Sequence, residues 1–162
     1  MKRILLSLLV SALAVPGAHA FDYVAGYRDW AVYRDTVNGE PVCYATTRAE
    51  DKSPKSADHG DVVFFVSYFR NSSQPQASLR TNFSFREDRP ARAEVSSRGW
   101  KLYPAGNEIF AMNEDENSIA EALRRGSELR IEAVSARNTE VAYHFSLSGS
   151  SNAIDKAKSL CG

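Results

Sequence analysis

Residues 141–148 read Val-Ala-Tyr-His-Phe-Ser-Leu-Ser, the clearest secondary-structure pattern in this chain of 162 residues. Large apolar side chains occupy every second position, with small or polar ones between them. Because successive side chains of a β-strand point to opposite faces, this alternation predicts a strand with one face in a core and the other in water. Gly149 ends the pattern.

Strand patterns recur along most of the chain before this stretch. Leu129, Ile131 and Ala133 alternate in the same way, and Arg137-Asn138 marks the turn after them. Asn38-Gly39 favours a hairpin, since both residues tolerate a positive φ. The run 61–69, DVVFFVSYF, is almost continuously apolar and predicts a strand buried on both faces. Further strands are expected at 27–33, 42–47, 79–85, 93–97, 100–103 and 108–112.

A polar loop at 50–60 and a helix ending at Arg124-Arg125 interrupt the strands. Gly126 is the expected C-terminal cap of this helix. Its start is open between Asn113 and Ser118, because each has a glutamate three residues later and can form a capping box.

A second short helix is expected at the C-terminus, capped by Ser151 or Asn152. Its Ile154, Ala157 and Cys161 share one helical face. Many short strands with few helices predict a mainly β fold, an antiparallel sandwich or barrel with one or two short helices. The apolar strand faces need a partner layer, so we expect two sheets packed face to face.

The first twenty residues have the pattern of a secretory signal peptide. Lys2 and Arg3 precede an apolar stretch at 4–15, and Ala18-His19-Ala20 is a small-x-small cleavage pattern. We therefore expect cleavage between Ala20 and Phe21 and a single domain at 21–162. The apolar stretch is shorter than the roughly 20 residues that span a bilayer, and no second long apolar run follows it. No transmembrane segment is expected after cleavage.

Charge and cysteine content narrow the environment and the partners. The chain has 20 Lys and Arg against 20 Asp and Glu, spread without a clustered basic face, which argues against nucleic acid as a partner. Cys43 and Cys161 are the two cysteines of a chain expected to leave the cytoplasm. Oxidation is permitted there, so we expect them to form an intramolecular disulfide.

Residues for catalysis or metal binding are few. After cleavage the histidines are His59, at a loop end where a turn role is expected, and His144, on the polar side of its strand. Asp58-His59 with a serine would need supporting geometry to act as a triad. Two isolated histidines make a weak zinc site. We expect no catalytic, cofactor-binding or metal-binding residues and no cofactor.

The charged clusters have simple structural interpretations. Residues 114–116, Glu-Asp-Glu, lack the spacing of a calcium loop and fit a helix N-terminus. Arg86, Arg89 and Arg92 are interrupted by acids and indicate a solvated loop, with anion binding as a minor alternative. Trp30 is expected in the core, and the place of Trp100 is open. The remaining aromatic residues at strand spacing are expected in the core: Phe64, Phe65, Phe83, Phe85, Tyr143 and Phe145.

Several short motifs, in this order and spacing, resemble those of the invasion-associated locus B proteins of alphaproteobacteria. The resemblance spans nearly the whole of 21–162 and includes no catalytic signature. Asn138 stands where similar sequences often have glycine, and Ser159-Leu160 separates the last alanine from Cys161. The motifs are Asp29-Trp30-Ala31-Val32, Pro41-Val42-Cys43-Tyr44, GDVVFFV at 60–66, Ser135-Ala136-Arg137, FSLSG at 145–149, AIDKA at 153–157 and Cys161.

The resemblance implies an immunoglobulin-like β-sandwich in the periplasm, with the outer surface or secretion as alternatives, and a link with host-cell invasion for some members. The first functional hypothesis is a non-enzymatic module that binds a protein or another envelope macromolecule. The alternative is an envelope-maintenance factor, such as a small inhibitor of a periplasmic or host hydrolase. A hydrolase using His59 or His144 is a weaker third.

Overall fold

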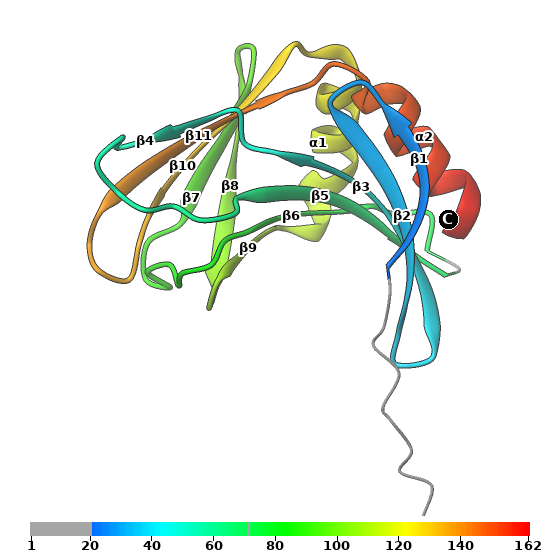
Figure 1. The fold of residues 1–162 in the computed structure, drawn as a ribbon, viewed down its shortest axis with the longest axis horizontal. Helices are drawn as coiled ribbons and strands as arrows, with labels where there is room; N and C mark the ends of the chain where they lie inside the picture. The colour runs from blue at the N-terminus through cyan, green and yellow to red at the C-terminus, as the bar shows by residue number, and fades with distance from the viewer. Residues whose placement is uncertain (1–20, 71) are drawn as a thin grey trace, which may run out of the picture.

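The computed structural model describes residues 21–70 and 72–162, so the expected signal peptide at 1–20 lies outside the described residues. The predicted mainly β fold is confirmed (Figure 1). The strands are β1 (Asp22–Tyr27), β2 (Trp30–Val37), β3 (Glu40–Arg48), β4 (Asp51–Ser53), β5 (Val63–Phe69), β6 (Gln76–Arg80), β7 (Ala91–Val95), β8 (Arg98–Ala105), β9 (Glu108–Ala111), β10 (Glu128–Val134) and β11 (Glu140–Ser146). The helices are α1 (Asn113–Arg125) and α2 (Ser150–Cys161).

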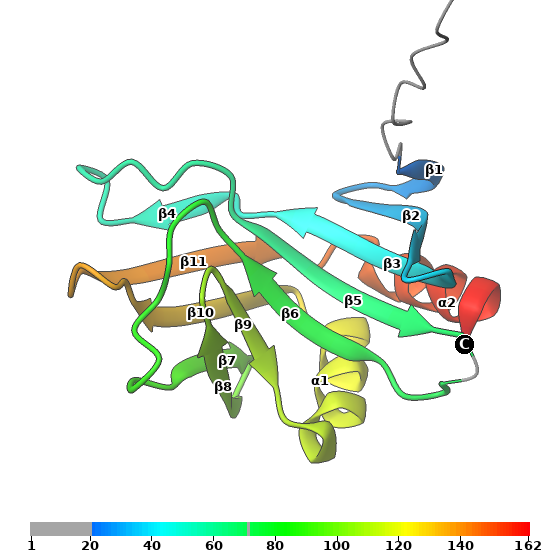
Figure 2. The same cartoon turned by 90° about the horizontal axis from the view of Figure 1, so that it is seen from below.

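All strands belong to one antiparallel sheet in the order β1-β2-β3-β5-β6-β9-β8-β7-β10-β11-β4. The expected two layers are therefore two parts of one sheet that folds over itself (Figure 2). β3 lies near one end of the order and β4 at the other, yet only Ala49 and Glu50 separate them in the chain. Glu50 donates its backbone N–H to the carbonyl of His144 at 2.9 Å, which helps to join β4 to β11.

The core lies between these two parts of the sheet. Phe64 on β5 and Phe145 on β11 face each other, with ring centroids 5.8 Å apart. Trp30 on β2 is buried, as predicted, and donates its indole N–H to the carbonyl of Ser146 at 2.9 Å. Trp100 is also largely buried, and its N–H donates to the hydroxyl of Ser118 at 2.7 Å.

The two helices pack together (Figure 1): α2 lies against β1, β2, β3 and β5, and α1 lies against β6 and β8. The apolar face of α2 is buried, including the predicted Ile154, Ala157 and Cys161. The structure contains the expected disulfide between Cys43 and Cys161, with Cα atoms 5.6 Å apart. The bond therefore holds α2 against the inner face of β3, the face opposite to Tyr44.

Gly149, rather than Ser151 or Asn152, is the residue that precedes the first turn of α2. Its φ is +94°, and a Cβ at this position would lie 1.8 Å from the carbonyl oxygen of Tyr27. Only glycine fits so close an approach of two backbones. The predicted turn at Asn38-Gly39 is confirmed, with φ values of +53° and +85°.

Other local predictions differ from the structure. The strand expected at 27–33 is broken by a turn at Arg28, whose φ is +55°. The strand expected at 79–85 ends at Arg80, because Thr81 turns the chain through a hydrogen bond from its hydroxyl to the carbonyl of Phe83. The loop expected at 50–60 contains β4. A three-residue edge strand with no apolar alternation carries too little pattern to be recognised.

The turn between β7 and β8 and the start of α1 also differ from the prediction. The turn between β7 and β8 lies at residues 96–97, within the strand expected at 93–97, and Ser96 has a φ of +56°. Helix α1 begins at Asn113, and its cap residue Met112 makes no side-chain cap bond, so neither expected capping box forms. Gly126 caps its C-terminus as predicted, donating its N–H to the carbonyl of Ala122.

Candidate binding face

The strand expected to be buried on both faces, β5, is buried on only one. Phe64, Val66 and Tyr68 point into the core, whereas Phe65 is half-buried and Phe69 exposed on the opposite side. The prediction for 61–69 is therefore wrong in its burial, and Phe65 does not belong to the core. A strand with apolar residues on both sides has a second apolar surface, and here that surface lines a groove.

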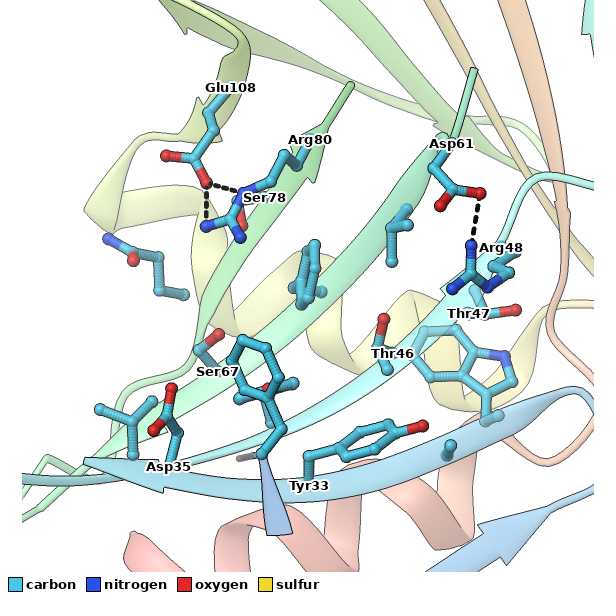
Figure 3. Close-up of a pocket in the computed structure, with 18 of the residues that line it drawn as sticks. Tyr33, Asp35, Thr46, Thr47, Arg48, Asp61, Ser67, Ser78, Arg80 and Glu108 are labelled. Atoms are coloured by element: carbon cyan, nitrogen blue, oxygen red, sulfur yellow. Dashed lines mark hydrogen bonds and ion pairs between the residues drawn. The ribbon is translucent and has the colours of Figure 1, made fainter. Parts of the chain in front are cut away.

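The groove lies on the outer face of β2, β3, β5 and β6, with β1 and β9 at its sides, and has a volume of about 1200 Å³ (Figure 3). Residues that point outward from these strands line it. Their register places Tyr33 opposite Tyr44 and Phe65 opposite Ser78. The lining side chains include Tyr23, Tyr33, Asp35, Tyr44, Thr46, Arg48, Phe65, Ser67, Phe69, Gln76, Ser78, Arg80, Glu108 and Phe110.

An aromatic ladder of Tyr23, Tyr33, Tyr44 and Phe65 crosses four strands of the groove. The distances between successive ring centroids are 5.7, 5.8 and 5.6 Å. The middle pair is stacked, with an interplanar angle of 22°. The guanidinium of Arg80 lies 5.3 Å from the Phe65 ring centroid and extends the ladder to β6. Such contacts hold the rings in fixed positions.

Small hydroxyl side chains form the floor between these rings (Figure 3). Thr46 pairs with Phe65 across β3 and β5, and Ser67 pairs with Tyr44. Ser78 lies opposite Phe65 on its other side. Because these small residues stand beside Tyr44 and Phe65, this part of the face is hollowed, and the hydroxyls of Ser67 and Ser78 line the hollow.

The charged residues of the groove are mostly paired. Arg48 Nη1 lies 2.5 Å from Asp61 Oδ1, and Arg80 Nη2 lies 2.6 Å from Glu108 Oε1 (Figure 3). Asp35 accepts the N–H of Thr36 on Oδ1, which leaves Oδ2 available. Burial, together with the negative charge of Asp35 and the neighbouring Tyr33, raises the pKa of Tyr44 to about 12. The Tyr44 hydroxyl is therefore a donor throughout the physiological pH range.

The groove also gathers exposed apolar side chains. Phe21, Tyr23, Val37 and Phe69 are between 39% and 63% exposed and all line it. Tyr103 and Met112, which are similarly exposed, do not. A contiguous apolar patch on a protein surface indicates an interaction site, whereas scattered apolar residues do not.

The two histidines serve the structure in different ways. His59 is buried, not turn-forming: Nδ1 lies 3.1 Å from the Tyr143 hydroxyl and Nε2 lies 2.8 Å from the Pro54 carbonyl. Asp58 accepts the backbone N–H of Gly60 and makes no hydrogen bond with His59. His144 Nδ1 lies 3.0 Å from a Glu128 oxygen. Among the hydrogen bonds of the described residues, neither histidine is joined to a serine, the nucleophile that a triad needs.

The charged clusters likewise do not converge on a ligand site. Glu116 is buried and accepts the N–H of Ala77 at 2.6 Å, and burial raises its pKa to about 7. Arg86 binds Asp88, and Arg92 binds Glu94. Across 21–70 and 72–162, no group of three or more His, Cys, Asp or Glu side chains is placed to hold a metal ion.

The groove is not predictable from local sequence patterns. Tyr33 and Tyr44 are equidistant from the Asn38-Gly39 turn, which pairs them, but their side of the sheet is not visible from that spacing. The useful signal was the run 61–69, whose apolar residues at both odd and even positions exceed what one core face needs.

The described chain therefore has a mainly β, sandwich-like fold with two packed helices and a groove on one outer face. The crystal structure of invasion associated protein B from Bartonella henselae is similar to it, with a TM-score of 0.59 and 18% identity, over 84% of this chain and 96% of that one. At this identity the likeness shows a shared fold. The sequence matches no protein-family model and no curated protein.

Proposed function

We propose that this chain is an exported, non-enzymatic protein that binds an envelope macromolecule or another protein through the groove. The observation that carries the proposal is the concentration of exposed apolar side chains there. Phe21, Val37 and Phe69 are exposed around the aromatic ladder, and Tyr23, the fourth exposed apolar residue, belongs to the ladder itself. Rigid aromatic rings beside polar groups are typical of binding sites.

The environment of the histidines supports a role without catalysis. Both ring nitrogens of His59 are engaged by Tyr143 and Pro54, so the ring is not free to take a proton from a nucleophile. The groove contains carboxylates, but Asp61 and Glu108 are paired with arginines. Each of these two carboxylates already holds an arginine, so neither is placed as a free general base beside a nucleophile.

Export to the periplasm or outer surface is part of the proposal. It is supported by the signal-like residues 1–20 and by the disulfide between Cys43 and Cys161. No helix in the described ranges is long and apolar enough to cross a membrane. The name of the B. henselae protein suggests that binding by this chain also contributes to host-cell invasion. Protein recovered from the envelope should have the intact mass of a chain beginning at Phe21; a full-length cytosolic chain would contradict export.

A capture experiment tests binding by the groove. The purified, disulfide-bonded protein is immobilised and incubated with envelope extract, in parallel with a Tyr33→Ser/Phe69→Ser variant. Tyr103→Ser is the matched control, because Tyr103 is 43% exposed but lies outside the groove. Circular dichroism first establishes that each variant is folded.

Material retained by the wild type and by Tyr103→Ser but lost from the groove variant supports the proposal. Equal retention by all three proteins, or no retention by the wild type, contradicts it. Protease or periodate treatment of the retained material then separates a protein ligand from a glycan, since periodate cleaves the vicinal diols of sugars.

A further inference from the structure

We propose that the ligand of the groove is an uncharged oligosaccharide chain, an inference that rests on the proposed function. The groove combines aromatic rings, small hydroxyls and planar polar side chains, and two of its three arginines, Arg48 and Arg80, are paired with carboxylates. Each of these features bears on a different class of ligand.

The pairing of the sheet disfavours an extended peptide strand in the groove. Strands β2, β3, β5 and β6, which form the floor, all have a neighbour on both sides. Their backbone N–H and C=O groups are used by the sheet, and the two free sheet edges belong to β1 and β4. A peptide strand is normally bound by adding to a free edge. A ligand on the floor must therefore be recognised by side chains.

The side chains of the floor both donate and accept hydrogen bonds. The hydroxyls of Ser67 and Ser78 can do either, and the amide of Gln76 offers both. The free oxygen of Asp35 can only accept, and the protonated hydroxyl of Tyr44 beside it can donate. A sugar hydroxyl can serve each of these partners, because it is donor and acceptor at once.

A proline-rich peptide, the other ligand that aromatic grooves commonly bind, matches less well. Proline has no backbone N–H, so such a peptide presents mainly acceptors. Its carbonyls could meet the tyrosine hydroxyls but would leave Oδ2 of Asp35 desolvated and without a donor, since only Oδ1 accepts the N–H of Thr36. An unpaired buried charge is costly, and this cost disfavours the peptide.

The aromatic residues suit the apolar face of a sugar ring. A hexose presents C–H groups on one face and hydroxyls around its rim. Phe21, Tyr23 and Phe69 are the most exposed rings of the groove and can stack on such a face. The half-buried rings of Tyr33 and Tyr44 also line the groove and offer further stacking surface. From β1 to β9 the sheet crosses five strand spacings, about 24 Å, enough for several linked sugar rings.

The charge of the groove selects against an anionic glycan. Arg48 and Arg80 are held by Asp61 and Glu108. Asp29 accepts a hydrogen bond from the hydroxyl of Ser146. The other charged residues that line the groove are two acids, Asp35 and Glu50, and one base, Arg28. No surplus of positive charge is left for sulfate, phosphate or carboxylate groups.

The test is a titration of the purified, disulfide-bonded protein with chitohexaose, cellohexaose and maltohexaose, followed by amide chemical shifts. A heparin hexasaccharide and decaproline are the comparison ligands. At least one neutral hexasaccharide should shift amides of the groove strands. Asp35→Asn, which keeps the side-chain shape, and Tyr33→Ala should each weaken that binding about tenfold, the effect of one lost charged hydrogen bond or stacking contact. Tyr103→Ala should leave the affinity within twofold.

The inference is wrong if none of the three neutral sugars shifts the groove amides, or if Asp35→Asn and Tyr33→Ala bind as tightly as the wild type. Decaproline or heparin shifting the groove in their place would also overturn it, while leaving binding by the groove intact. Failure of the capture experiment would instead contradict the groove as a binding surface.

Discussion

Removal of the disulfide between Cys43 and Cys161 should destabilise the protein strongly. The two cysteines are 118 residues apart in sequence, so the bond closes most of the chain into a loop. The loss of chain entropy in the unfolded state gives about 4 to 5 kcal/mol for a loop of that length. Residual structure in the unfolded chain lowers this value, so it is an upper figure.

The expected change in melting temperature follows from the size of the domain. Unfolding entropy of roughly 2 cal/mol/K per residue gives about 0.3 kcal/mol/K for a chain of about 140 residues. A loss of 4 kcal/mol therefore lowers Tm by about 10 to 15 °C. α2 should respond most, because twelve residues are too few for a helix to be stable by itself.

The measurement compares a Cys43→Ala/Cys161→Ala variant with the oxidised wild type by circular dichroism. Ser159→Ala, at an exposed position of α2, is the control and should melt within about 2 °C of the wild type. Limited proteolysis should cleave the variant first within 150–162. A fall in Tm of less than about 3 °C, with α2 still protected, would refute the reasoning.

Three further predictions concern a buried acid, a close backbone contact and the histidines. Burial raises the pKa of Glu116 from 4.5 to about 7, so the folded protein holds a proton there that the unfolded chain loses. This stabilisation is complete below pH 4.5 and is lost as the pH rises through 7. The Tm of Glu116→Gln minus the Tm of the wild type should therefore grow from pH 5 to pH 8. A constant difference in Tm would contradict the assignment. Gly149→Ala should lower the free energy of unfolding in urea by more than about 2 kcal/mol, because the new Cβ would overlap the Tyr27 carbonyl. Gly39→Ala has open space around it and should cost about 1 kcal/mol, the strain of its positive φ. Equal losses in the two variants would exclude the clash. His144→Ala should retain the captured material as the wild type does. His59→Ala should be less stable, but the folded fraction should still bind. Loss of binding in folded, stable variants would reopen a functional role for the histidines.

Several features of the fold were predictable because they depend on neighbouring residues. The alternation at 141–147 correctly identified the core face of β11. Asn38-Gly39 correctly located the turn of the hairpin between β2 and β3. The C-terminal helix face with Ile154 and Ala157 is another local pattern. Each of these follows from a period of two or 3.6 residues or from the φ that a residue tolerates.

The groove depends on contacts that no local pattern contains. The run 61–69 is apolar on both sides of its strand, and only the packing of β11 and α2 decided that Phe64 enters the core while Phe65 faces outward. The polar β4 extends the sheet because the chain passes directly from β3 to the exposed side of β11.

The sequence by itself thus determined the strands with clear alternation, such as β10 and β11, the pair of cysteines available for a disulfide and the scarcity of catalytic groups. The tertiary structure alone decided which apolar face is the core and which is the groove, because the second layer that buries one face comes from residues about 80 positions further along the chain.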